Sequence, residues 1–419
     1  MGHAKPDFDP VSLSPLSFWS GTPRERDESL RILRAERPVS YHPPAEGSMM
    51  PPEEGVGGFW AVVRNEDIRA ISTDPETFCS GEGITLEDLP VAILETVSSF
   101  LAMDSPRHMQ LRRLCSSAFT PRRVAQVEGQ IAGQAKRIVD DLMDNPEGDL
   151  VSAVSRRLPM MTIFEMMGVD EDYRVEASET VDGLTSWADE DVRGELLPEE
   201  LLMNSMLGLL RIALEIAEAR RSDPRDDLMT ALVQAEVDGR GMNDEEVAAY
   251  FILLAVAGND TTRNTISHTA RALTEFPEQR KILMEDFGGR IGTAVEEMVR
   301  WATPVMTFRR TVTRDVEFGG VQMSEGDWVG LFYQSGNRDE AAFQNPWQFD
   351  VLRDPNPHVG FGGGGPHYCL GTMLARAQLR SIWGELLTRV PEFEVGEPDY
   401  LVGNFMSAVK RLPYRLNLG

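Results

Sequence analysis

The 419-residue sequence is poor in cysteine and in positive charge. Its three cysteines, Cys79, Cys115 and Cys369, are too few and too odd in number for a disulfide framework. Lys and Arg total 41 against 67 for Asp and Glu, so the formal net charge is −26. A chain this acidic lacks the cationic surplus that phosphate neutralisation requires. The composition therefore favours a reducing compartment and excludes a general nucleic-acid or anionic-membrane binder.

Long apolar runs and targeting signals are also missing. The most apolar stretch, residues 248–258, is shorter than the about 20 residues that a membrane-spanning helix needs, and it predicts a buried helix segment. The first residues, MGHAKPDFDPVSLSPLSFW, lack the apolar core of a signal peptide. We therefore expect a cytoplasmic protein without a membrane span.

What is present is a large apolar fraction with helical spacing. Hydrophobic residues make up 42% of the chain, which is enough for a sizeable core. Residues 244–276 contain no proline and predict a helix of roughly 45–50 Å, long enough to cross a domain. Short β-like runs lie at 58–64, 307–313, 316–318 and 328–333. We expect a single, mainly α-helical domain over residues 1–419 with a minor β portion.

The segment FGGGGPHYCLG, residues 361–371, carries the first chemical signal. Four consecutive glycines are costly in chain entropy, so they indicate a sharp turn or a close approach to something flat. Cys369 follows them just before a predicted helix, whose first N–H groups can stabilise a thiolate. A single thiolate beside open space suits haem iron. Alternatives are a phosphate loop, which lacks the GK[ST] ending, an inert core cysteine, or a nucleophile paired with His367.

A second signal lies inside the predicted long helix, in the sequence AGNDTT of residues 257–262. Glycine and threonine are poor helix-interior residues, and a threonine hydroxyl can bond back to the carbonyl four residues earlier and bend the helix. Asp260 beside the hydroxyl of Thr261 offers a proton relay. Taken alone, the pattern also fits a polar kink or an acid on a solvated helix face.

These two segments together resemble the cytochrome P450 family of haem-thiolate monooxygenases. The sequence EMVR, from Glu297 to Arg300, is similar to the family's Glu-x-x-Arg motif. The resemblance implies a triangular-prism helical fold around a long central helix, with haem b ligated by Cys369. Phe361 stands one residue further from the cysteine than in the common family loop, and Gly362 occupies the usual place of that aromatic residue. This longer loop resembles that of the mycobacterial lipid and sterol terminal hydroxylases.

The resemblance also implies a role for each matching residue. Thr261 and Asp260 act at the oxygen site, where Asp260 helps to deliver protons. Glu297, Arg300 and Arg353 form a buried salt-bridge group that braces the cysteine loop. The expected haem contacts are His108, Arg112, Gly258, Arg310, His358, Phe361, Gly362 and Gly371. Arg310 is chosen over Arg309 because neighbouring strand residues face opposite sides.

The expected substrate is long and apolar. Its predicted contacts are Leu254, Val256, Ala257, Val305, Met306 and Phe405, with further lining from the 80–100 loop and the 175–205 region. The similarity to the terminal hydroxylases favours ω-hydroxylation of methyl-branched fatty acids or isoprenoid lipids. Sterol side-chain oxidation and macrolide or polyketide tailoring are the alternatives. A haem protein that only binds a gas or ligand remains a further alternative, which the Asp260–Thr261 pair disfavours.

The chain has no flavin fingerprint and no iron–sulfur spacing, so its electrons must come from elsewhere. The partners expected are O2, a separate ferredoxin and a ferredoxin reductase, with the protein itself a monomer. An acidic ferredoxin requires a basic patch on an otherwise acidic surface. The predicted patch consists of Arg112, Arg113, Arg122, Arg123, Arg376 and Arg380.

Overall fold

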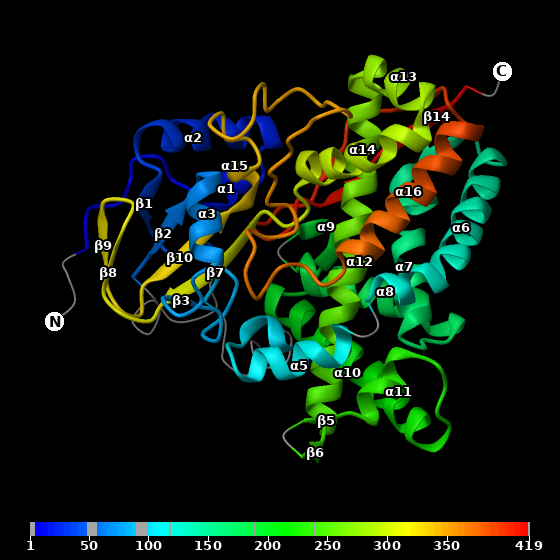
Figure 1. Ribbon diagram of the computed structural model, residues 1–419, viewed down its shortest axis with the longest axis horizontal. Coiled ribbons are helices and arrows are strands. Elements are labelled where there is room, and N and C mark those ends of the chain that lie inside the picture. The colour runs from blue at the N-terminus through cyan, green and yellow to red at the C-terminus, as the bar shows by residue number, and fades with distance from the viewer. Residues whose placement is uncertain are drawn as a thin grey trace.

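The computed structural model describes residues 5–47, 57–88, 99–116, 119–187, 189–237 and 239–417. Most helices gather on one side and the main sheet on the other, with helix α12 (Asp244–Glu275) running through the helical part (Figure 1). The other long helices are α2 (Pro23–Glu36), α3 (Asn65–Ser72), α5 (Arg107–Ser116), α6 (Pro121–Met143), α7 (Arg157–Met166), α8 (Glu171–Thr185), α10 (Pro198–Ser222), α13 (Pro277–Glu285), α14 (Phe287–Ala302) and α16 (Thr372–Arg389). Shorter turns are α1 (Leu16–Trp19), α9 (Glu190–Arg193), α11 (Leu228–Val233), α15 (Tyr333–Gly336), the 3-10 turn η1 (Ser99–Ala102) and the π turn η2 (Val151–Ser155). The predicted mainly α fold with a minor β portion is confirmed.

Helix α12 confirms the long proline-free helix expected from the sequence. It begins at a capping box in which the Asn243 side chain accepts from the Glu246 N–H, and it continues for 32 residues. A Cβ on Gly258 would lie 2.6 Å from the Ile163 side chain on α7. The glycine is therefore needed where α7 packs against α12. None of the helices in the described ranges is long and apolar enough to cross a membrane.

The main sheet has five strands in the order β1-β2-β10-β7-β3. They are β1 (Val39–His42), β2 (Phe59–Val62), β3 (Phe78–Cys79), β7 (Thr307–Val312) and β10 (Trp328–Phe332). β2 and β10 pair in parallel and the other neighbours antiparallel. Three of the four β-like runs seen in the sequence meet here. The fourth forms the hairpin of β8 (Val316–Phe318) and β9 (Val321–Met323), which turns at two glycines with positive φ, Gly319 and Gly320.

The remaining strands form small pairings among the helices. They are β4 (Glu147–Asp149), β5 (Glu236–Val237), β6 (Arg240–Gly241), β11 (Phe393–Val395), β12 (Asp399–Tyr400), β13 (Val409–Arg411) and β14 (Pro413–Leu416). The largest apolar cluster lies in the helical part and includes Phe251, Phe164 and Trp383, each fully buried. A smaller cluster lies between the sheet and helices α1 and α2, around Trp19 and Phe332. The surface of the helical cluster along α12 forms one wall of the site.

Candidate active site

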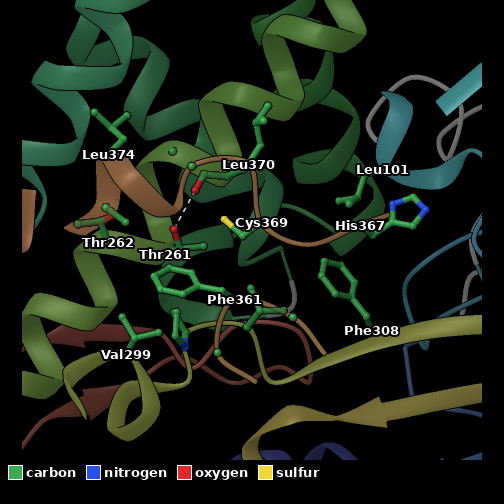
Figure 2. A pocket seen from close by; sticks show the side chains of 18 of the residues that line it. Leu101, Thr261, Thr262, Val299, Phe308, Phe361, His367, Cys369, Leu370 and Leu374 are labelled. Atoms are coloured by element: carbon green, nitrogen blue, oxygen red, sulfur yellow. Dashed lines mark hydrogen bonds between the residues drawn. The ribbon is translucent and has the colours of Figure 1, made fainter. Parts of the chain in front are cut away.

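A cavity of about 1460 Å³, its open mouth included, lies between α12, residues 361–371 and the start of β7. Figure 2 shows Cys369 and Thr261 facing the same space, with Phe308 and Leu101 further along it. The described lining residues include no Asp or Glu, and most of the wall is apolar.

Residues 361–371, the cysteine loop, hold Cys369 at the cavity wall. The Cys369 N–H donates to the Phe361 carbonyl at 3.0 Å, which closes the loop on itself. Burial raises the pKa of the Cys369 thiol, while the Gly371 N–H and the charges of Arg112 and Arg376 work to lower it. A thiol buried among donors and cations is suited to bind a metal as thiolate, because the metal replaces the proton.

The glycines of this loop lie against helix α3. Gly365 has a φ of +71°, and a Cβ there would lie 2.1 Å from the Ser72 carbonyl oxygen. Gly363 lies equally close to the Ser72 side chain, with 2.4 Å from its would-be Cβ to Oγ. The four glycines predict that the loop backbone comes close to another surface, and part of that surface is helix α3 of the protein itself. Gly362, Gly363 and Gly364 also line the cavity.

The AGNDTT segment of α12 splits its residues between the cavity and the protein interior. Ala257, Gly258 and Thr261 line the cavity, and Ala257 is exposed to it. The Thr261 hydroxyl donates to the Ala257 carbonyl at 2.8 Å, the back-bonding expected from the sequence (Figure 2). The hydroxyl oxygen is left with acceptor capacity toward the cavity.

Asp260 points the other way, toward helix α8. Its side chain accepts from the Thr185 hydroxyl at 2.8 Å and lies 3.7 Å from the Arg263 guanidinium. Burial raises the pKa of Asp260 to about 6, against the opposing effect of Arg263. A carboxyl group that titrates near neutrality beside a chain of polar groups can take up and release protons.

Four hydrogen-bond donors converge on one end of the cavity. Arg112, Arg310 and His367 line it, and the His108 ring lies 4.1 Å from the His367 ring. Both His108 ring nitrogens and His367 Nδ1 are buried without a hydrogen-bond partner among the described residues. Burial, with Arg310, His108 and Arg112, lowers the pKa of His367 to about 2. Donors without acceptors fit the two carboxylates of haem.

His367 is a site residue that sequence reasoning missed. The sequence pattern suggests it only as a nucleophile partner of Cys369, two positions away. The available signal was that a loop that carries the iron ligand must also pass the edge of the macrocycle, where carboxylates need donors.

His358, in contrast, does not join this cluster, and the expectation that it contacts a haem carboxylate does not hold in this structure. Its Nε2 lies 3.0 Å from the Glu296 carboxylate, and its Nδ1 accepts from the Gly360 N–H at 3.1 Å. With both ring nitrogens used by the protein, no donor remains for a cofactor.

The salt-bridge group of Glu297, Arg300 and Arg353 is brought together as expected. Arg300 donates two hydrogen bonds of 2.7 Å to the Glu297 carboxylate, and both side chains are fully buried. Arg353 Nε reaches Glu297 Oε2 at 3.1 Å. Glu297 also accepts from the Asp350 N–H and from Asn356, so it ties α14 to the chain that leads into the cysteine loop.

The choice of Arg310 over Arg309 agrees with the strand register. Arg310 opposes Val329 in β10 and its side chain lines the cavity. Arg309 points to the other face, where its guanidinium carbon lies 3.4 Å from the centroid of the Trp328 ring. The two neighbouring arginines therefore have different roles: Arg310 is a hydrogen-bond donor at the cavity, and Arg309 is buried and stacks on Trp328.

The predicted substrate contacts divide into two groups. Leu254, Ala257 and Val305 line the cavity, whereas Val256, Met306 and Phe405 do not. Met306 is fully buried in the cluster with Trp19 and Phe332, on the opposite face of the chain from Val305. The Phe405 ring packs against the lining residue Phe308, with 5.5 Å between the ring centroids. Residues 89–98 of the expected lining loop, and the side chains of Cys115 and Arg123, lie outside the described residues.

Comparison with known proteins agrees with this geometry. The family model described as cytochrome P450 matches residues 93–399. The chain is 40% identical to the methyl-branched lipid omega-hydroxylase of Mycobacterium tuberculosis over 96% of this chain and 94% of that protein. It is 36% identical to the steroid C26-monooxygenase of Mycolicibacterium smegmatis over 91% and 88%. A Mycobacterium marinum cytochrome P450 in complex with pseudoionone superposes with a TM-score of 0.96 at 49% identity, covering 99% of this chain and all of that one.

These relatives are named hydroxylases and monooxygenases, which removes the alternative of a protein that only binds a gas or ligand. The thiol, the cavity and the donor cluster provide what a haem needs, and the chain belongs to the cytochrome P450 family of haem-thiolate monooxygenases.

Proposed function

We propose that the substrate is a methyl-branched lipid chain and that it is hydroxylated at its terminal methyl group. The observation that carries this proposal is the distribution of charge in the cavity. The two cationic lining residues, Arg112 and Arg310, and the neutral donor His367 lie at the end where haem carboxylates would bind. Most of the wall elsewhere is formed by apolar side chains such as Leu101, Phe119, Leu253, Leu254, Val305 and Phe308. An apolar chain end is therefore the part of a substrate that can approach the Thr261 side of the cavity without losing hydrogen bonds.

Haem b, when bound, supplies the activation of O2. In this proposal Cys369 holds the iron, and His108, Arg112, Arg310 and His367 hold the carboxylates. Thr261 offers its hydroxyl oxygen to the cavity, and Asp260 carries protons from the α8 side. The names of the two curated relatives support the position of attack, since both describe oxidation at a chain terminus.

The electron donor we propose is a separate ferredoxin with its reductase, in the cytoplasm. Arg113 and Arg122 are exposed and can meet an acidic partner. Arg112 and Arg376 are already engaged, with the Tyr368 carbonyl and with Glu296. Charge reversal of Arg113 should slow ferredoxin-driven turnover and leave peroxide-driven turnover unchanged. A ferredoxin-driven rate in the variant equal to that of the wild type would show that Arg113 is not part of the ferredoxin-binding surface.

The substrate is tested by optical titration of the ferric protein. The panel contains a methyl-branched fatty acid, the straight-chain acid of equal carbon number, a sterol with an intact side chain, and pseudoionone. We expect the branched acid to shift the haem to high spin at a concentration at least about tenfold below that of the straight-chain acid, a difference of about 1.4 kcal/mol. Turnover with a surrogate ferredoxin should then yield the terminal alcohol. No shift with any branched lipid would refute the proposal.

A sterol is the second candidate, because one relative at 36% identity is named a steroid C26-monooxygenase. A sterol side chain also ends in a branched methyl terminus, so the same wall can hold it. Tighter binding of the sterol than of the branched acid, with oxidation confined to the side chain, would select this function instead.

A further inference from the structure

Glu296 on α14 is bound by three donors from two different segments. Its Oε1 accepts from Arg376 Nε at 2.6 Å, and its Oε2 lies 2.9 Å from Arg376 Nη2 and 3.0 Å from His358 Nε2. Burial works to raise the pKa of Glu296, but the hydrogen bonds from His358 and Arg376 outweigh it and lower the pKa to about 2. The carboxylate is therefore a permanent negative charge.

Both partners of Glu296 lead to the start of the cysteine loop. His358 Nδ1 accepts from the Gly360 N–H at 3.1 Å. The Arg376 guanidinium carbon lies 4.8 Å from the centroid of the Phe361 ring, within cation–π range. Phe361 in turn accepts the Cys369 N–H at 3.0 Å through its carbonyl. One carboxylate thus holds two successive residues at the entrance of the loop, and the second of them is bonded to the cysteine.

Glu296 also decides how much positive charge acts on the thiolate. Arg376 lies on α16, seven positions after Cys369 in the sequence, and its charge favours the ionised form of the cysteine. Two short hydrogen bonds to Glu296 offset that charge, because a bidentate pair is neutral at a distance. Arg112 has no acidic side chain within 4 Å among the described residues, and its proposed acidic partners are the haem carboxylates. Glu296 is therefore the compensation that the protein itself provides, and it acts on Arg376.

We propose that Glu296 is a positioning residue for the axial ligand: through Arg376 and His358 it holds the cysteine loop, and it offsets the Arg376 charge so that the thiolate keeps its electron donation to iron. The proposal depends on Cys369 as the haem ligand and is independent of the substrate. A change in substrate preference would leave it standing, and its own failure would leave the hydroxylase function standing.

The test measures the reduction potential of the bound haem. Glu296→Gln keeps the size and the acceptor oxygen but removes the charge. Arg376 then faces the thiolate uncompensated, and the potential should rise because positive charge favours the added electron. Arg376→Gln should do the reverse and lower the potential, since the Glu296 charge remains. The double variant should return toward the wild-type value.

The matched control is Glu128→Gln. Glu128 is the exposed carboxylate partner of Arg380, and Arg380 lies on α16 as Arg376 does. This control should leave the potential unchanged.

The share of carbon monoxide complex with the thiolate absorption band should fall in Glu296→Gln and recover in the double variant. Opposite shifts with recovery cannot arise from loosened packing alone. An unchanged potential in Glu296→Gln, or shifts of the same sign in both single variants, would overturn the proposal. If Glu296→Gln does not fold, a potential that fails to fall in Arg376→Gln overturns it.

Discussion

The Thr185 hydroxyl donates a 2.8 Å hydrogen bond to the Asp260 carboxylate, and this contact turns the acid away from the cavity that its neighbour Thr261 lines. Arg263 lies beside the same carboxylate and is paired with Asp182, whose side chain is 20% exposed. The acid therefore lies between a partly solvated ion pair and the helix residue that faces the cavity. In the proposed function, protons would therefore reach Asp260 from the α8 side of α12.

Thr261→Ala should uncouple oxygen consumption from product formation, because the hydroxyl facing the cavity is lost. We expect hydrogen peroxide release to rise at least about tenfold relative to product, which corresponds to about 1.4 kcal/mol. Peroxide and alcohol are measured in the same reconstituted reaction. Thr269→Ala, two turns further along α12 and fully buried, is the control. Full coupling in Thr261→Ala would contradict the role.

Asp260 should make stability depend on pH. Its pKa is raised from 3.8 to about 6 by burial, so the folded state binds the proton more tightly than the unfolded state. The contribution of Asp260 to the free energy of unfolding is therefore fully present below about pH 4 and is lost as the pH rises through 6. Urea unfolding between pH 4 and pH 6 should show the free energy of unfolding of the wild type falling through this contribution as the pH rises. The Asp260→Asn variant should lack that part of the pH dependence. Asp144→Asn, an exposed carboxyl change, should keep the slope. Equal slopes in wild type and Asp260→Asn would disprove the shift.

His367→Ala should weaken haem retention, because one of four converging donors is removed. We expect haem transfer to an excess of a haem-scavenging protein to be about tenfold faster, equivalent to the loss of one hydrogen bond to a charged group. His367→Gln, which keeps a donor at similar reach, should retain haem better than the alanine variant. Identical haem transfer rates in wild type and His367→Ala would show that His367 does not hold a haem carboxylate.

Glu297→Gln should be strongly destabilising, since Arg300 is fully buried and would lose its compensating charge. Breaking a buried pair in this way costs about 3–5 kcal/mol. Glu176→Gln, which removes the exposed partner of Arg211, should cost no more than about 1 kcal/mol. Denaturant unfolding of both variants compares the two costs. If Glu297→Gln lowers the free energy of unfolding as little as Glu176→Gln does, then the buried Glu297–Arg300–Arg353 group does not brace the fold.

Gly365→Ala should impair folding of the cysteine loop, because the new Cβ would meet the Ser72 carbonyl and the φ of +71° disfavours alanine. The yield of haem-loaded protein is the measurement. Gly292→Ala in α14, where nothing lies within 4 Å of the new Cβ, should be neutral or stabilise by up to about 1 kcal/mol. Normal haem loading in Gly365→Ala would show that the loop can shift away from α3.

Much of the site could be predicted from local sequence because its chemistry is local. The glycines, Cys369 and the following helix are contiguous, as are Ala257 and Thr261 on one helix. The alternation of side chains along a strand is enough to separate Arg310 from Arg309, because it does not depend on the rest of the fold. Val305 lines the cavity and Met306 does not, but both residues precede the strand that begins at Thr307, so alternation could not separate them in advance.

Local sequence determined which residue types are available: a single cysteine behind four glycines, an acid–alcohol pair in a long helix, and a Glu-x-x-Arg pair. Tertiary structure alone decided which histidine faces the cavity and which faces Glu296, because that depends on groups brought together from distant parts of the chain. Glu296 itself carries no motif, and its role arises only where α14, α16 and the cysteine loop meet. The direction of Asp260 was likewise settled by packing, since a helix residue can point either way until a neighbouring helix offers a hydroxyl and an ion pair in place of water.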